Sequence, residues 1–168
     1  MAGKVIGKTL PVGFRGNVTR TPDTIISPHC NVGDAPIQFG EPVIYDAAKK
    51  GVRKVLSTDA NAADLVGIAV RRIGQPYADD ANGWYYKKGD VVDVLLRGSI
   101  AVEVATTTGI AARGDVYVCT GATEGETAGA IVCENAGSGR LKMPNAVFAT
   151  GIYDGEKIAE ITILSRSM

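Results

Sequence analysis

Residues 91–104 read VVDVLLRGSIAVEV and carry the clearest structural signal in the chain. Every even position in this stretch is apolar apart from Gly98, whereas the charged residues Asp93, Arg97 and Glu103 all fall at odd positions. A period of two is typical of a β-strand with one face toward a core. The alternation continues across Gly98, and a two-residue hairpin needs more turn-forming residues than a single glycine. We therefore predict one long strand, bent at Gly98, that curls round a barrel or serves two sheets.

Shorter apolar segments on both sides of this stretch indicate further strands separated by turns. The chain contains 21 glycines, and glycine followed by an acid precedes apolar segments at positions 40–41, 89–90 and 114–115. Glycine supplies positive φ and the acid can bond nearby amides, so these pairs suit tight turns. We expect strands near residues 37–39, 43–45, 52–56, 66–70, 115–120, 130–134, 146–153 and 158–164.

Residues 57–65 (STDANAADL) differ from the strand pattern, because Ser57, Thr58 or Asp59 can cap a helix. We predict a helix of at most two turns there. The fold class predicted from the sequence is all-β: an antiparallel β-barrel or β-sandwich with one short helix and an extended N-terminal arm.

The N-terminal arm is predicted over residues 1–34, which contain three prolines and five glycines and show no lasting apolar period. Residues 35–168 form the predicted β-rich domain. We expect Phe14, Arg15, Arg20, Ile25 and Ile26 in the arm to contact a partner. The alternatives of a loop wrapped on its own domain and of a frayed terminus remain open.

Composition and charge exclude several functional classes. Lys plus Arg and Asp plus Glu are both 18, so the chain lacks the broad positive field of a general nucleic-acid binder. No apolar stretch approaches the ~18 residues that span a bilayer, and residues 1–10 lack the apolar run of a secretory signal. Three cysteines without a CxxC pair and the single His29 support neither a disulfide framework nor a zinc site. We expect no catalytic, metal-binding or cofactor-binding residue, and no contact with nucleic acid or membrane.

Motifs that resemble functional sites fit structural explanations better. Residues 3–9 (GKVIGKT) have three residues between the glycines, whereas a phosphate-binding loop needs four. Residues 113–115 (RGD) repeat the glycine-acid pattern that precedes strands, and Asp79 and Asp80 are not followed by calcium-loop spacing.

The aromatic residues Trp84, Tyr85 and Tyr86 stand beside Lys87 and Lys88. Such a cluster can stack on bases or sugars, or it can anchor a protein interface while keeping a polar group in water. We prefer the interface and expect Trp84 and Tyr85 to contact a partner. A carbohydrate- or peptide-binding β module centred on residues 84–86 is the alternative, and a small β-barrel enzyme with an unrecognised site is a third possibility.

Taken together, the segments FGEPVIYD, ADLVGIAVRR, KKGDVVDVLLRGSIAVEV, ARGDVYVCTG and NAVFATGIYDGEKIAEITI resemble phage capsid cement (head decoration) proteins. The similarity covers roughly residues 36–164, and residues 1–34 have no matching motif. The resemblance implies a non-enzymatic virion protein on the capsid exterior that binds an assembled phage head and bridges neighbouring major capsid subunits. Its expected partner is the phage major capsid protein. We also expect a homo-oligomer, either a dimer or a trimer, on the capsid.

Overall fold

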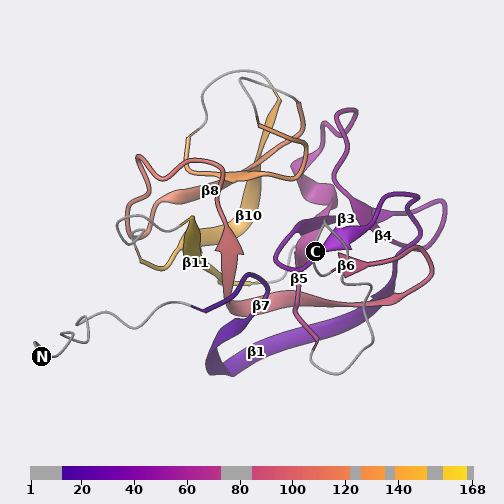
Figure 1. Ribbon diagram of the computed structural model, residues 1–168, viewed down its shortest axis with the longest axis horizontal. Helices are drawn as coiled ribbons and strands as arrows, with labels where there is room; N and C mark the ends of the chain where they lie inside the picture. Colours follow the sequence, from indigo (N-terminus) through magenta and orange to yellow (C-terminus); the bar gives the residue numbers. More distant parts are fainter. Residues whose placement is uncertain (1–12, 73–84, 122–125, 135–138, 151–156, 166–168) are drawn as a thin grey trace, which may run out of the picture.

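The computed structural model describes residues 13–72, 85–121, 126–134, 139–150 and 157–165, and these residues form an all-β fold without an α-helix. Most of the strands belong to one antiparallel sheet that curls strongly into a half-barrel (Figure 1). The strands are β1 (Val18–Cys30), β2 (Ile37–Gln38), β3 (Pro42–Asp46), β4 (Gly51–Lys54), β5 (Leu65–Ala69), β6 (Tyr85–Tyr86), β7 (Val91–Glu103), β8 (Asp115–Cys119), β9 (Ile131–Val132), β10 (Arg140–Phe148) and β11 (Ile158–Ile163).

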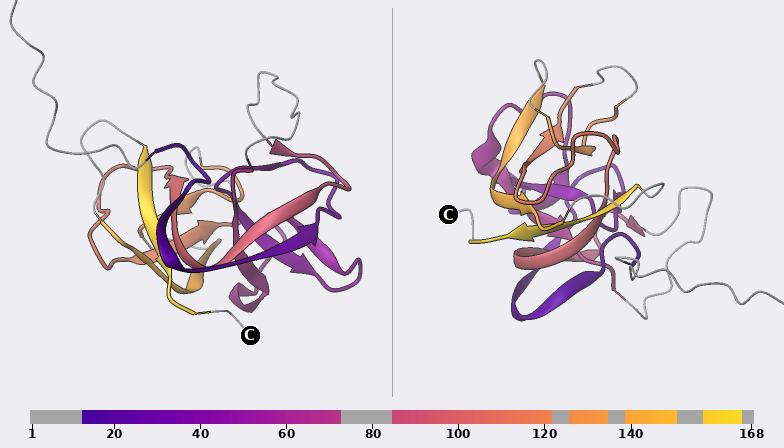
Figure 2. Two further views of the ribbon diagram at one scale, coloured as in Figure 1. Left: turned by 90° about the horizontal axis from the view of Figure 1, so that it is seen from below. Right: turned by 90° about the vertical axis from the view of Figure 1, so that its left-hand side faces the viewer.

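Strand β7 lies at the centre of the large sheet, whose order is β4-β3-β5-β7-β11-β10-β8-β9. Strand β1 is not part of this order and pairs with the edge of β7 opposite to β5 and β11. Strands β3, β4 and β5 gather at one end of the molecule and β8, β10 and β11 at the other, while β1 and β7 run side by side between them (Figures 1 and 2). The short strands β2 and β6 form a second sheet. The prediction of an antiparallel all-β fold is confirmed.

The bend predicted at Gly98 is present in β7, which continues for thirteen residues through this glycine. Gly98 has a φ of +122°, a conformation that side-chain-bearing residues rarely adopt. On one edge, β7 pairs with β5 through Val94 and Leu95, and from Gly98 onward it pairs with β11. On the other edge, β1 has a register shift between Arg20 and Ile25, opposite the bend.

The bend also changes which core the strand serves. Before Gly98, the even-numbered Val92 and Val94 pack in one core, and beyond it the even-numbered Ile100 and Val102 pack in the other. Leu95, an odd-numbered residue, belongs to the same core as Ile100. The alternation in the sequence is therefore regular, but the strand exchanges its faces where the backbone bends.

The two cores share strands β3, β5 and β7, because neighbouring residues of these strands enter different cores. The smaller core consists of Ile37, Phe39, Val43, Val52, Ala69, Tyr86, Val92 and Val94. The larger core contains, among others, Ile44, Leu65, Ile68, Leu95, Ile100, Val102, Val116, Phe148 and Ile161. Isolated bridges from Asn31 to Val52 and from Val104 to Ile131 curl the sheet back on itself at both ends.

The helix expected over residues 57–65 is a single 3-10 turn, Ala62–Asp64, capped by the side chain of Asn61. The predicted capping residue Asp59 has another role. Its carboxylate accepts a hydrogen bond from the backbone N–H of Leu56 and two from the guanidinium of Arg53, at 2.8 and 2.6 Å. Because the buried Leu65 then starts β5, no room remains for a second helical turn.

The N-terminal segment is partly built into the sheet. Residues 18–30, which lie within the predicted arm, form β1 and pair with β7 of the same chain. Residues 1–12 lie outside the described part. The division of the chain into an arm of residues 1–34 and a domain of residues 35–168 stays a prediction. Strand β1 carries Pro22 and Pro28, which have no N–H to donate, and prolines of this kind are typical of strands at a sheet edge.

Candidate functional site

Arg20, one of the expected partner contacts, holds β1 to β11 across the intervening β7. Its Nε and Nη2 atoms each donate a 2.8 Å hydrogen bond to the carboxylate of Glu160, which also accepts one from the Thr19 hydroxyl. The Glu160 side chain is only 6% exposed. The hydrogen bonds from Arg20 lower the pKa of Glu160 below its usual range, against the opposing effect of burial. Arg20 thus has a structural role within the chain, although most of its side chain faces solvent.

The expected contacts Ile25 and Ile26 are neighbours in β1 at a shift in its register with β7. Ile25 is half-buried and pairs with Arg97, while Ile26 is exposed and pairs with the buried Leu95. Arg97 also forms an ion pair with Asp23. Of the two isoleucines, Ile26 offers the larger apolar surface to a partner.

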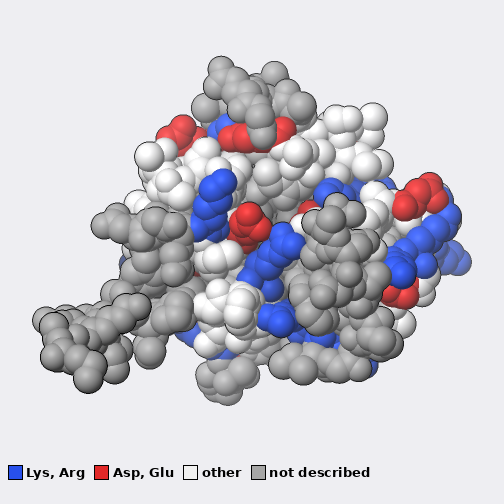
Figure 3. Space-filling model, in the orientation of Figure 1, with Lys and Arg blue, Asp and Glu red and all other residues white. Residues whose placement is uncertain are grey.

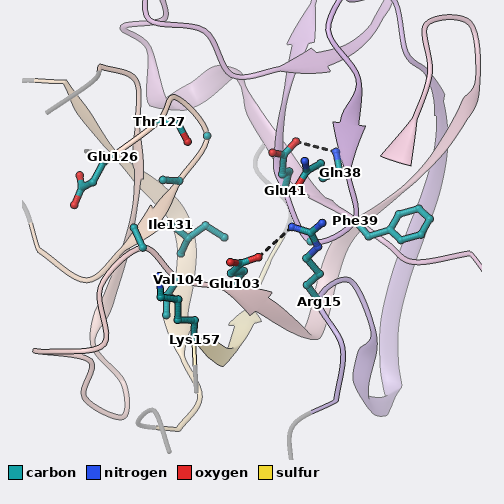
Figure 4. A pocket seen from close by; sticks show the side chains of 14 residues that line it. Arg15, Gln38, Phe39, Glu41, Glu103, Val104, Glu126, Thr127, Ile131 and Lys157 are labelled. Atoms are coloured by element: carbon teal, nitrogen blue, oxygen red, sulfur yellow. Dashed lines mark hydrogen bonds and ion pairs between the residues drawn. The ribbon is translucent and has the colours of Figure 1, made fainter. Parts of the chain in front are cut away.

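Arg15 lines a polar cleft of about 310 Å³ between the two ends of the molecule, here called the Arg15 cleft (Figure 4). Its Nη1 donates a 3.0 Å hydrogen bond to Glu103 at the end of β7. On the same side, Glu41 accepts hydrogen bonds from the Lys54 ammonium and the Gln38 backbone N–H, both at 2.8 Å.

Farther along the Arg15 cleft, Glu126 is paired with Arg140. The carboxylates of Glu41, Glu103 and Glu126 are therefore each paired with a cation, and that of Glu41 also accepts from a backbone N–H. Lys157, also in the cleft, is exposed, and its ammonium has no ion pair among the described residues. Carboxylates neutralised in this way are poor candidates for acid-base chemistry. The ammonium of Lys157 can accept a negatively charged group from another molecule.

Phe14 lies at the entrance to β1 and is 70% exposed. The guanidinium carbon of Arg71 stands 4.9 Å from the centre of its ring, a cation–π geometry. Together with Gly13, Arg15, Phe39 and Ile158, these two residues surround a second hollow of about 320 Å³, here called the Phe14 pocket. Its walls are largely apolar.

The aromatic cluster is only partly at the surface. Tyr86 is fully buried, packs edge-on against Phe39 with ring centres 5.2 Å apart, and donates a 2.6 Å hydrogen bond to the carbonyl of Val70. Tyr85 is half-buried, and it pairs with Gln38. Trp84 lies outside the described residues. Tyr86 is therefore a core residue and offers no ring on which a sugar or base can stack.

The cysteines and acidic residues form no reactive cluster in the described ranges. All three cysteines are free, and burial together with the neighbouring Glu126 raises the pKa of Cys119 to about 12. A thiol with so high a pKa is a weak nucleophile at neutral pH. Within residues 13–72, 85–121, 126–134, 139–150 and 157–165, no group of three or more His, Cys, Asp or Glu side chains could hold a metal ion.

One face of the molecule shows how charged side chains are distributed over the described residues. On the face shown in Figure 3, acidic side chains stand beside basic ones, and no broad patch of one sign covers the described part. The described part also contains no helix of the length and hydrophobicity needed to cross a membrane.

The sequence did not identify Glu160, Glu103 or Arg71 as site residues. In the structure Glu160 contacts Arg20, Glu103 contacts Arg15, and Arg71 contacts Phe14. Glu160 carried a usable signal, because it is the one acid within the apolar stretch IAEITI. Arg71 gave none, since its approach to Phe14 depends on long-range folding.

The family of the chain is shown by a comparison with protein-family models, and its fold by a comparison with solved structures. The model of the family described as structural cement protein (E217 gp24/Pam3 gp6) matches residues 3–164. A chain in a solved structure described as the capsid of Myoviridae phage XM1 is similar in fold, with a TM-score of 0.68, 17% sequence identity and 98% of both chains covered. No curated protein matches the sequence.

Proposed function

This chain belongs to the phage structural cement protein family, and we propose that it binds the outside of an assembled head and bridges neighbouring major capsid subunits. The family is one of structural proteins of the capsid, not of enzymes. What the proposal adds is the place of binding, the partner and the mode of action.

The distribution of exposed apolar side chains is the observation that carries the proposal. Six large apolar side chains of the described residues are between 42% and 70% exposed. Phe14 precedes β1, Leu56 follows β4 and Leu164 follows β11, whereas Ile26, Tyr45 and Val91 lie within β1, β3 and β7. A protein that bridges two subunits needs at least two contact surfaces. Stable pairing buries roughly 1,200–2,000 Å² at each interface, and exposed apolar side chains supply much of the energy at the centre of such surfaces.

Self-association would strengthen binding to a closed shell. We propose that the protein is a dimer or a trimer on the capsid, because linked copies that engage repeated sites gain avidity without new contacts. Light scattering of the purified protein at micromolar concentration tests this part separately. A monomer both free and on the head would refute it.

Binding to heads tests the main proposal. Heads purified from a phage whose cement gene has been deleted are mixed with the full-length protein, sedimented, and imaged by electron cryomicroscopy. We expect saturable binding at a fixed ratio to the shell protein, with density on the outer surface that touches two shell subunits. Heat-denatured protein is the control. Absence of binding would refute the proposal, and density confined to one subunit or to the inner surface would refute bridging or the exterior location.

A further inference from the structure

A hollow of about 210 Å³, here called the Gly98 pocket, lies at the bend of β7, between β1 and the end of β11. Two features leave this space open. Gly98 has no side chain to fill it, and β1 has a register shift between Arg20 and Ile25, where its chain bulges away from β7. The walls of the pocket are more apolar than polar, and Ile163 and Leu164 contribute to them. A cavity of roughly 150 Å³ accepts a benzene molecule, so the Gly98 pocket has room for a branched aliphatic side chain.

The walls of the Gly98 pocket are held in place by contacts within the chain. The Arg97 guanidinium in β7 donates a 2.6 Å hydrogen bond to the carboxylate of Asp23 in β1. Within the bulge of β1, the Thr24 hydroxyl donates a 3.1 Å hydrogen bond to the carbonyl of Arg20. A surface that is formed before binding avoids part of the entropic cost of ordering.

Leu164 projects from the wall of this pocket and is 57% exposed. Its backbone is fixed, because its N–H donates a 2.8 Å hydrogen bond to the carbonyl of Asn145 in β10. An apolar side chain at a fixed position therefore stands beside a largely apolar hollow, and both face water. Covering such area contributes about 25 cal/mol per Å².

The surface around the Gly98 pocket carries both members of each kind of contact. It has an apolar projection and an apolar hollow, and it has an exposed acid and an exposed base, since the side chains of Asp23 and Arg97 are 70% and 42% exposed. An unrelated partner that fills the hollow still has to supply a second hollow for Leu164, and a partner of one charge repels one member of the Asp23–Arg97 pair. A second copy of this chain, related by a two-fold axis, meets each requirement with the same residues, as an isologous interface does.

From this we infer that the Gly98 pocket is the two-fold interface of a dimer, in which Leu164 of each copy enters the pocket of the other and Asp23 of each copy faces Arg97 of the other. The inference rests on the proposed function, because it names the surface through which copies associate and selects the dimer over the trimer. A two-fold dimer carries two identical head-binding surfaces, one on each copy, so a single dimer can engage two shell subunits.

Substitution of Leu164 tests the inference in solution. Sedimentation velocity over a concentration series measures the dissociation constant of the dimer. Leu164→Ala should raise this constant by roughly tenfold or more, the loss expected when an apolar side chain is removed from the centre of an interface. Leu56→Ala, which shortens a 44% exposed leucine after β4, is the matched control and should associate as the wild type does. An unchanged dimer in folded Leu164→Ala protein, or a trimer in the wild type, would overturn the inference.

Reversing the charges separates a contact between copies from a contact within one chain. Asp23→Arg and Arg97→Asp each bring like charges together at the interface, so neither variant alone should dimerise. In a mixture of the two variants, each carboxylate meets a guanidinium of the other copy, although the pair within each chain stays broken. We expect a one-to-one heterodimer by native mass spectrometry. Variants that remain separate on mixing, or that each dimerise as the wild type does, would contradict the proposed interface.

A photo-crosslinker in place of Leu164 identifies the occupant directly, even if a charge variant folds poorly. Leu164→p-benzoylphenylalanine protein should crosslink to a second copy of this chain near Gly98, both in solution and on heads. Crosslinks to the shell protein alone, or no crosslink between copies, would refute the inference while leaving binding to the head intact. Failure of the wild-type protein to bind heads would instead refute the proposed function, whatever the result for the dimer.

Discussion

Arg20 and Glu160 are joined by two hydrogen bonds of 2.8 Å across strand β7, although 140 residues separate them in the chain. The two side chains differ sharply in environment, since Arg20 is 64% exposed and Glu160 only 6%. Burial removes most of the water that would otherwise solvate the carboxylate. Its charge is stabilised mainly by Arg20 and Thr19, and this contact fixes the start of β1 over the centre of the sheet.

Glu160→Gln should lower the free energy of unfolding by about 2 kcal/mol, because a charge-assisted pair is lost and the Arg20 guanidinium is left without its anion. Urea unfolding at pH 7 measures the change. Glu103→Gln is the matched control: the Glu103 side chain is 50% exposed in its pair with Arg15, and exposed pairs are worth about 0–1 kcal/mol. Equal losses in the two variants would contradict the structural role assigned to Glu160.

The low pKa of Glu160 predicts a loss of stability in acid. Since Arg20 lowers the pKa of the folded carboxyl below the ordinary value of 4.5, the unfolded chain takes up the proton first. The stabilisation is complete above about pH 4.5 and disappears as the pH falls through the lower folded value. We expect the stability difference between wild type and Glu160→Gln to shrink when urea unfolding is repeated from pH 7 down to pH 3. A difference that does not depend on pH would refute this account.

His29 predicts a second, higher pH dependence. Its Nε2 atom is buried without a hydrogen-bond partner in the described structure, and burial lowers the pKa of the imidazole below 6.5. Between the lowered folded value and 6.5 the unfolded chain binds more protons, so stability falls as the pH drops through this range.

Because His29 is the only histidine of the chain, its ring protons give an unambiguous NMR titration. We expect a midpoint below 6.5, and a smaller loss of stability between pH 7.5 and pH 5.5 in His29→Gln than in the wild type. A midpoint at or above 6.5 would show that burial does not control this group.

Gly67 is expected to tolerate no side chain. A Cβ at this position would overlap the carbonyl oxygen of Leu95, a backbone atom of the central strand that cannot move without breaking the β5–β7 pairing. Gly67→Ala should cost about 3 kcal/mol or prevent folding. Gly121→Ala is the control, because a Cβ there meets nothing within 4 Å. Thermal unfolding of the two variants measures the contrast, and similar melting temperatures would contradict the close approach seen at Gly67.

The strands and the class of fold were largely predictable from local patterns. Residues 91–104 show a strict period of two, and Gly98 interrupts it without changing its parity, so both the long strand and its bend could be foreseen. Of the nine residues of β10, only the last three, from Ala146, were predicted. The preceding six residues contain Arg140, Lys142 and Pro144, which hide the strand pattern.

The candidate contacts were predicted less completely, because exposure depends on packing between distant segments. Phe14 and Ile26 are exposed as a partner contact requires, whereas Arg20 is engaged by Glu160 and Tyr86 is enclosed by Phe39 and Val70. Nothing local to Tyr85 and Tyr86 shows which of these neighbouring rings faces the core.

The sequence by itself determined that the chain forms an antiparallel all-β protein with a long central strand, because alternation and turn residues act over a few positions. Only the tertiary structure decided that this strand exchanges its faces at Gly98, so that Val94 and Ile100 serve different cores. It also decided that Glu160 is buried while Glu103 remains exposed. Pairing register and burial arise from contacts between residues far apart in the chain, and a local pattern contains no record of which segment will cover which side chain.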